Sequence, residues 1–205
     1  MVLSKLQRDI ENIYSLRAFD PVELYLMTAN ELRQTNPELP HLPQVLFQEK
    51  EGEALLGIYL SEETRRNLEI GGLENATLED FCTATEEISH FVYLTHCASS
   101  EKKVSLLDLE VQAEVDKFLL ATHYFGKDRR LFSRLFETIA FRSHLSEPEK
   151  YRYEEANRLG AKMARWLGSA VKSGGLAGNT LEFLRNFYRM QSHDKLNKVE
   201  KMKGI

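Results

Sequence analysis

The segment of residues 104–124 constrains the fold most, because at helical spacing it is apolar on two nearly opposite sides. A helix buries each apolar side that it has, so a helix with two of them lies at the centre of a bundle. We therefore predict a multi-helix bundle built around this segment. The first side consists of Leu107, Val111, Val115, Phe118 and Leu119, and the second of Leu106, Leu109, Ala113, Leu120 and Tyr124.

Start and stop signals divide the rest of the chain into further helices. Thr77 is a suitable N-cap for one long helix, and Gly126 stands where a left-handed residue would end the central one. Asn179 and Glu182 form a capping box for the last helix. Together with the apolar spacing, these signals predict helices over residues 3–16, 21–32, 78–97, 104–124, 131–141 and 151–171, with a last one after residue 179.

Residues 44–60 carry the strongest β signal. Apolar runs at residues 45–47 and 55–60 flank Glu51 and Gly52, which favour a tight turn, and the prolines within residues 37–43 prevent a helix just before them. An isolated hairpin is marginally stable in water, so we expect its apolar face to pack on the helices. The predicted fold class is mainly α (α+β): a multi-helix bundle with one β-hairpin near residues 44–60.

Charge is distributed unevenly along the chain. Residues 150–205 contain 12 Lys and Arg against 5 Asp and Glu, a net charge of +7, whereas the preceding residues carry a net charge of −11. We predict one helical domain over residues 1–190 with the hairpin embedded in it, and a basic C-terminal tail over residues 191–205. Because little apolar surface holds this tail, we expect it to be flexible.

The simplest explanation of the opposed charges is attraction within the molecule. A contact between nucleic acid and the basic C-terminal region is a weaker interpretation, because the tail has four lysines with no aromatic residue between them on which a base could stack. The acidic remainder of the chain also disfavours such binding.

Several classes of protein have no support in the sequence. No run of 18 apolar residues is present, and the first residues are amphipathic and charged, so we expect a cytoplasmic protein without a membrane partner. Cys82 and Cys97 are too few for a disulfide framework, and we expect both to be reduced. The phosphate-binding loop, the dinucleotide fingerprint and the nucleophile elbow of α/β-hydrolases are all missing.

One polar stripe on the predicted helix of residues 78–97 contains side chains that can bind a metal ion. Glu86, His90, Tyr93 and Cys97 are spaced by 4, 3 and 4 residues and stand above one another. Glu86 and His90 can reach one divalent ion when a neighbouring helix supplies further ligands, and Glu87 with His90 is a second option. Residues 86–90 differ from the zincin motif at one position, because Glu86 replaces the first histidine of that motif.

The central helix carries carboxylates between its two apolar sides. Glu110, Glu114 and Lys117 form one stripe, and Asp108, Gln112 and Asp116 form the other. A buried carboxylate without a partner costs several kcal/mol, so we expect partners for at least one stripe. The candidates are Lys117 for Glu114, His90 or arginines of adjacent helices, and a metal ion.

Two functions follow as expectations. The first is an interaction or accessory protein that binds another protein, needs no cofactor, and exposes an apolar groove near the hairpin or the last helix. The alternative is a metal-dependent hydrolase with a Mn, Fe or Zn ion between two central helices and Tyr93 as a proton donor. In that alternative the predicted metal ligands are Glu86, His90, Glu110 and Glu114.

Overall fold

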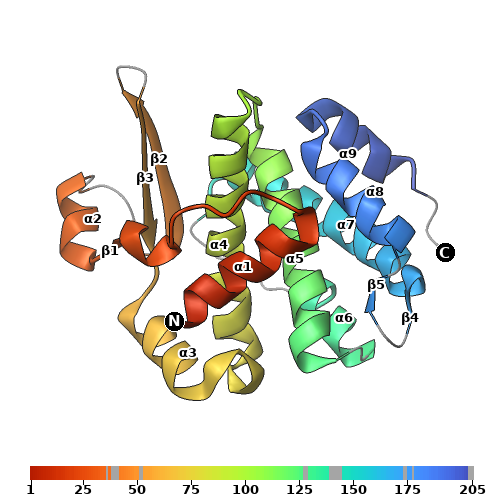
Figure 1. Ribbon diagram of the computed structural model, residues 1–205, viewed down its shortest axis with the longest axis horizontal. Coiled ribbons are helices and arrows are strands. Elements are labelled where there is room, and N and C mark those ends of the chain that lie inside the picture. The colour runs from red at the N-terminus through yellow and green to blue at the C-terminus, as the bar shows by residue number, and fades with distance from the viewer. Residues whose placement is uncertain are drawn as a thin grey trace.

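Two long helices, α4 (Leu78–Ser99) and α5 (Leu106–Phe125), form the centre of the protein (Figure 1). We describe a computed structural model covering residues 1–35, 37, 42–50, 53–126, 129–138, 145–172, 175–176 and 178–202. Helix α5 packs on α4 and on α7 (Glu147–Ala170), and its buried residues lie all around the helix. The central position predicted from its two apolar sides is therefore confirmed.

Two predicted residues, Thr77 and Gly126, and one that was not predicted, Ser105, lie at ends of the central helices. The Thr77 hydroxyl accepts a hydrogen bond from the backbone N–H of Asp80 at 3.1 Å, and the Ser105 hydroxyl accepts one from Asp108 at 3.2 Å. Gly126 ends α5 with a φ of 80°, a backbone angle that other residues rarely adopt. Local signals thus place these helix ends correctly.

Helix α7 approaches α5 closely at a glycine. A Cβ atom on Gly160 would stand 2.5 Å from the Cβ atom of Glu114, and so only glycine allows this distance between the helices. This contact brings the first residues of α7 beside the carboxylates of α5.

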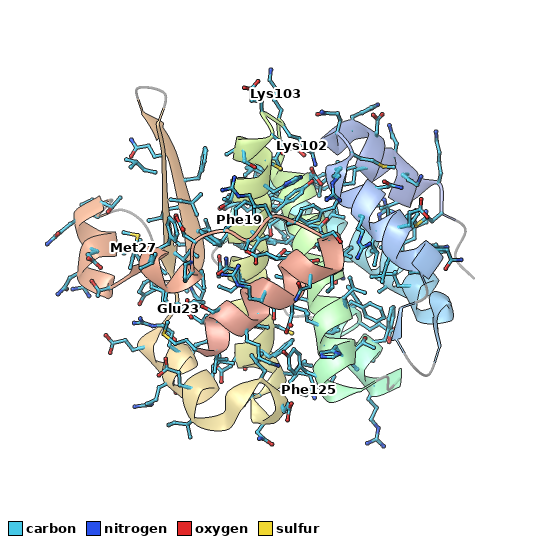
Figure 2. The ribbon with its side chains drawn as sticks, in the orientation of Figure 1. Phe19, Glu23, Met27, Lys102, Lys103 and Phe125 are labelled. Carbon is cyan, nitrogen blue, oxygen red and sulfur yellow. The ribbon has the colours of Figure 1, made fainter. Side chains whose placement is uncertain are left out.

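The helix predicted over residues 21–32 is wrong in its middle. The chain forms a 3₁₀ turn (Val22–Tyr25), strand β1 (Leu26–Met27) and helix α2 (Ala29–Thr35). Strand β1 pairs in parallel with β3, and a Cβ atom on Gly57 would stand 2.4 Å from the sulfur of Met27. Met27 packs across the sheet beside the hairpin (Figure 2). A long-range pairing that local spacing does not encode therefore overrides the helical pattern.

The predicted hairpin is confirmed as β2 (Gln44–Lys50) and β3 (Glu53–Tyr59). The strand order is β1-β3-β2, so β2 forms one edge of the sheet within the described part of the chain. Val45 lies opposite Ile58, and the two side chains share the face that packs on the helical core. The predicted turn residues Glu51 and Gly52, like most of the proline-rich segment before β2, lie outside the described residues.

The remaining helices surround this centre. Helix α3 (Glu62–Asn75), which the sequence analysis did not predict, begins at Ser61, whose hydroxyl accepts from the Thr64 N–H at 3.0 Å, and contains a kink at Gly72. Two short strands, β4 (Val171–Lys172) and β5 (Gly175–Leu176), follow α7. The other helices are α1 (Val2–Tyr14), α6 (Arg129–Phe136), α8 (Gly178–Arg189) and α9 (Ser192–Glu200).

Helix α8 supports the end of α1. Arg189 donates to the carbonyl oxygens of Tyr14 at 2.9 Å and Ser15 at 3.2 Å, and Arg185 donates to that of Ile13 at 3.2 Å. These arginines bind carbonyl groups that have no partner within α1, and so the first helix is completed by a late segment of the chain.

The C-terminal segment differs from the loosely held tail that the sequence predicts. Residues 192–200 form α9, in which Lys195 and Val199 are fully buried. Lys195 makes an ion pair with Asp108 of α5, and Arg158 of α7 pairs with Glu155 and Glu200. These contacts favour attraction within the molecule as the reason for the opposed charges.

The fold class is therefore mainly α and includes the predicted hairpin, and β4 and β5 form a second, two-residue antiparallel pair. None of the described helices is long and apolar enough to cross a membrane.

Candidate functional site

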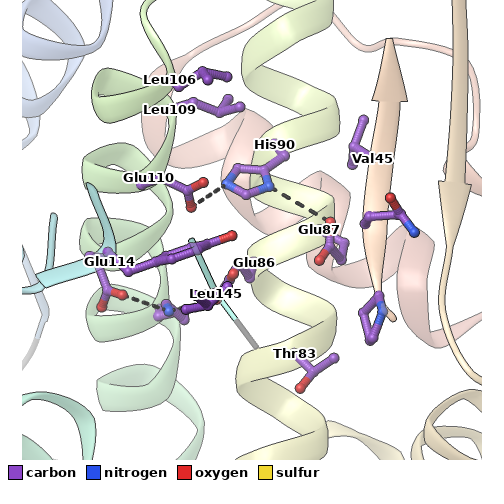
Figure 3. A pocket seen from close by; sticks show the side chains of 14 residues that line it. Val45, Thr83, Glu86, Glu87, His90, Leu106, Leu109, Glu110, Glu114 and Leu145 are labelled. Atoms are coloured by element: carbon purple, nitrogen blue, oxygen red, sulfur yellow. Dashed lines mark hydrogen bonds and ion pairs between the residues drawn. The ribbon is translucent and has the colours of Figure 1, made fainter. Parts of the chain in front are cut away.

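A cavity of about 360 Å³ lies between α4 and α5, with the beginning of β2 and α7 at its margins (Figure 3). All four residues predicted as metal ligands line it: Glu86 and His90 on α4, and Glu110 and Glu114 on α5. The two polar stripes thus converge on one place, as the hydrolase interpretation required. Within the cavity, however, these residues form two separate clusters.

The upper cluster is centred on His90, which lies between two carboxylates (Figure 3). Its Nε2 atom is 3.3 Å from Oε2 of Glu110, and its Nδ1 atom is 3.7 Å from Oε2 of Glu87. Arg152 of α7 brings a second cation to Glu110, with 3.7 Å between Nε and Oε1. We call Glu87, His90 and Glu110 the imidazole cluster.

The charge state of the imidazole cluster follows from burial and proximity. Burial alone would lower the pKa of His90, but Glu110 and Glu87 outweigh it and raise the pKa to about 10. Burial raises the pKa of Glu87, and the nearby His90 opposes this change. At neutral pH the imidazole is therefore protonated, and each of its nitrogen atoms carries a hydrogen.

The lower cluster is centred on Lys117, whose ammonium lies 2.8 Å from Oε2 of Glu86 and 2.8 Å from Oε1 of Glu114. Burial would lower the pKa of Lys117, but the two carboxylates hold it well above its ordinary value. The pairing of Lys117 with Glu114 confirms one predicted partner, since a buried carboxylate needs such a cation.

This arrangement provides protein cations where the hydrolase interpretation placed a metal ion. No group of three or more His, Cys, Asp and Glu side chains in the described ranges is close enough together to hold a metal. The ammonium of Lys117 contacts Glu86 and Glu114, and a protonated His90 must lose its proton before a nitrogen atom can bind a metal. The metal ligand set therefore stays a prediction that the geometry does not favour.

Tyr93, predicted as a proton donor, lies in another network. Its hydroxyl donates to Oδ2 of Asp108 at 2.9 Å and accepts from the ammonium of Lys195 at 2.8 Å. Cys97, on the same stripe, is buried in the core and, like Cys82, forms no disulfide. The tyrosine that lines the cavity is instead Tyr153 of α7, whose pKa is raised to about 12 by burial and by nearby Glu110 and Glu86.

The second carboxylate stripe of α5 is enclosed by other side chains. Asp116 accepts from the hydroxyls of Tyr14 at 2.5 Å and Ser89 at 2.6 Å, and from the amide of Gln112 at 3.0 Å. Burial raises the pKa of Asp116 to about 6. This stripe joins α1, α4 and α5 and faces away from the cavity residues of α5, so we assign it a structural role.

Several cavity residues were not predicted from the sequence. Gln44 and Val45 of β2, Arg152 and Tyr153 reach the site from elements distant in the chain. The alternation of residues along β2 could have indicated a half-buried strand, but no local pattern indicates that Arg152 lies beside Glu110.

Part of the rim of the cavity is apolar. Leu109 and Val45 line it, and Leu106, which is 61% exposed, extends it outward. Further along β2, Phe47 is 45% exposed. A second hollow of about 780 Å³ lies between the hairpin and α2. Exposed apolar side chains and a second hollow therefore lie near the hairpin, where the interaction hypothesis expected an apolar groove.

No protein-family model matches the chain, and no curated protein or solved structure is significantly similar to it. Function must therefore be argued from the geometry of the site.

Proposed function

We propose that the protein is a binding module that takes up an extended segment of a partner protein beside β2. The segment would add a strand to the sheet, and one of its side chains would enter the cavity between α4 and α5. The observation that carries this proposal is the position of β2 at the edge of the sheet, with Gln44 and Val45 at the cavity.

The backbone of β2 offers the means of attachment. Alternate residues of an edge strand direct their N–H and C=O groups away from the neighbouring strand, where they can pair with another chain. Within the described part of the chain β2 pairs only with β3. A strand added there would lie about 4.8 Å from β2, so its side chains would come within reach of the cavity.

The surface around β2 suits a peptide. Leu106 supplies an exposed apolar contact at the cavity, Phe47 supplies another further along β2, and the imidazole cluster supplies polar groups inside the cavity. Recognition sites of this kind combine backbone pairing for affinity with pockets for specificity.

A random library of displayed 12-residue peptides, selected on the full chain, tests the proposal. We expect enriched peptides that bind one to one and slow the hydrogen exchange of backbone amides in residues 44–48. Phe47→Lys should weaken their binding about tenfold, a loss of roughly 1.4 kcal/mol. Ile70→Lys is the matched control, because Ile70 is 80% exposed on α3 and lines none of the cavities described above.

Failure of the library to yield a binder would contradict the proposal. So would peptides that protect amides outside β2 or that bind the Phe47→Lys variant as tightly as the wild type.

A metal-dependent hydrolase is the second candidate, supported by the convergence of Glu86, His90, Glu110 and Glu114 on one cavity. Elemental mass spectrometry of the purified protein tests it, with His90→Ala as the comparison. Stoichiometric Mn, Fe or Zn that disappears in the variant would favour the hydrolase, and equal traces in both proteins would count against it.

A further inference from the structure

Two buried polar atoms in the imidazole cluster lack hydrogen-bond partners among the described residues. They are Oε2 of Glu87 and Nε2 of His90, on residues that are 5% and 7% exposed. The distances of 3.7 Å from Glu87 to His90 and 3.3 Å from His90 to Glu110 belong to ion pairs whose geometry is poor for hydrogen bonds. Buried polar groups are nearly always paired in folded proteins, and both residues line the cavity, so both atoms are available to a group that enters it.

The two atoms need opposite partners. A carboxylate oxygen of Glu87 accepts hydrogen bonds, and Nε2 of His90, which lies 3.3 Å from the Glu110 carboxylate, carries a hydrogen that it can donate. A ligand that satisfies both atoms must therefore offer one donor and one acceptor.

A charged group of a ligand can form a favourable hydrogen bond with only one of these two atoms. An ammonium or guanidinium group donates to Glu87, but it has no acceptor for His90 and lies beside the positive imidazole. A carboxylate accepts from His90 but faces the negative charges of Glu87 and Glu110. A neutral group that both donates and accepts meets both demands without repulsion, and a carboxamide does so with two separate atoms.

We infer that the side chain entering the cavity carries a carboxamide, as asparagine and glutamine do. Its oxygen accepts from Nε2 of His90, and its NH₂ group donates to Oε2 of Glu87. The cavity of about 360 Å³ has room for such a side chain, and its apolar rim contacts the methylene groups. This inference rests on the proposed peptide-binding function.

Four small molecules of similar shape test the ligand chemistry on the full chain: propionamide, propionate, n-propylammonium and n-propanol. The ring nitrogen signals of ¹⁵N-labelled His90 and the backbone amide of Val45 report binding by NMR. We expect propionamide to saturate both signals with an affinity about tenfold above that of each other probe. Tighter binding of any other probe, or no saturable binding of propionamide, would overturn the inference.

Variants test the part that the imidazole cluster plays in binding. Glu87→Gln keeps the shape of the side chain but places an amide where a carboxylate accepted, so propionamide should bind at least about tenfold more weakly. Ile70→Ala, at an exposed position of α3 that does not line the cavity, should leave binding unchanged. Equal binding by wild type and Glu87→Gln would contradict the inference.

The peptide library distinguishes this inference from the proposed function. One outcome would contradict the carboxamide inference and still support the peptide-binding function. In that outcome the enriched peptides slow amide exchange in β2 but share no asparagine or glutamine, and propionamide does not bind. Saturable binding of propionamide without any enriched peptide would contradict the peptide-binding function but support a carboxamide site in the cavity.

Discussion

The ammonium of Lys195 lies 2.8 Å from Oδ1 of Asp108, and neither side chain has any exposed surface. The pair joins α9 to α5, and the Tyr93 hydroxyl contacts both residues. Burial lowers the pKa of Lys195 to about 8, although Asp108 opposes the change. Two charges enclosed in this way depend on each other, because either one alone would be a buried ion without a counter-ion.

Lys195→Met should therefore destabilise the protein by about 3 to 5 kcal/mol, since it leaves the Asp108 carboxylate buried without the ammonium. Urea unfolding followed by circular dichroism measures the loss. Lys201→Met, which removes the same charge from an exposed position, should change stability by less than about 0.5 kcal/mol. Equal effects of the two substitutions would show that the buried pair adds nothing to stability.

Two glycines of α7 should respond oppositely to alanine. Gly160→Ala places a Cβ atom 2.5 Å from Cβ of Glu114 and should cost about 1 to 3 kcal/mol, because α7 must move away from α5. At Gly168 nothing lies within 4 Å of the added atom, and so Gly168→Ala should stabilise the helix by roughly 0.5 to 1 kcal/mol. Thermal unfolding of both variants checks the signs, and a stabilising Gly160→Ala would contradict the close helix contact.

Two histidines should titrate on opposite sides of the ordinary value of 6.5. His90 should lose its proton near pH 10, and His96 below pH 6.5, because burial and the nearby Arg189 and Lys102 lower the pKa of His96. ¹⁵N-histidine NMR, with assignments from His90→Gln and His96→Gln, follows both.

The titration of His90 also predicts a pH dependence of stability. The unfolded chain releases this proton near pH 6.5 and the folded protein near pH 10, so the contribution of His90 is complete below pH 6.5 and is lost as the pH rises toward 10. A folded-state midpoint at or below 6.5 would contradict the carboxylate contacts at both ring nitrogens.

Asp116 should make stability depend on pH in the acidic range. Its pKa of about 6 in the folded protein lies above its ordinary value of 3.8, so its contribution is complete below pH 3.8 and decreases as the pH rises through 6. Asp116→Asn removes this dependence, and the variant should gain on the order of 2 kcal/mol relative to wild type between pH 4 and pH 7. Urea unfolding at both pH values tests this, and a constant difference would contradict it.

Local sequence predicts those parts of the fold that local interactions determine. Thr77 and Gly126 locate helix ends because caps act within one turn, and the spacing of Glu86, His90, Glu110 and Glu114 places them on facing stripes because helix geometry is regular. The convergence on one cavity is therefore predictable once α4 and α5 are known to be adjacent.

Local sequence patterns do not predict contacts between residues that are distant in the chain. Leu26 and Met27 join a sheet because Gly57, thirty residues later, leaves room for the methionine side chain. Lys195 is buried because Asp108 on α5 supplies its counter-ion. Arg152 reaches the site because α7 packs on α5. A helical pattern or a basic stretch has the same appearance with or without these partners, so the sequence alone does not distinguish them.

The placement of α8 and α9 has a consequence for biosynthesis. The carbonyl groups at the end of α1 receive Arg185 and Arg189, and Asp108 receives Lys195, only after residue 195 has left the ribosome. Until then the nascent chain contains an acidic group that cannot be buried with this counter-ion. We therefore expect the central helices to complete their packing only after α9 has been synthesised, and chains that terminate before α9 to expose an incomplete core to the proteases that remove unfolded proteins.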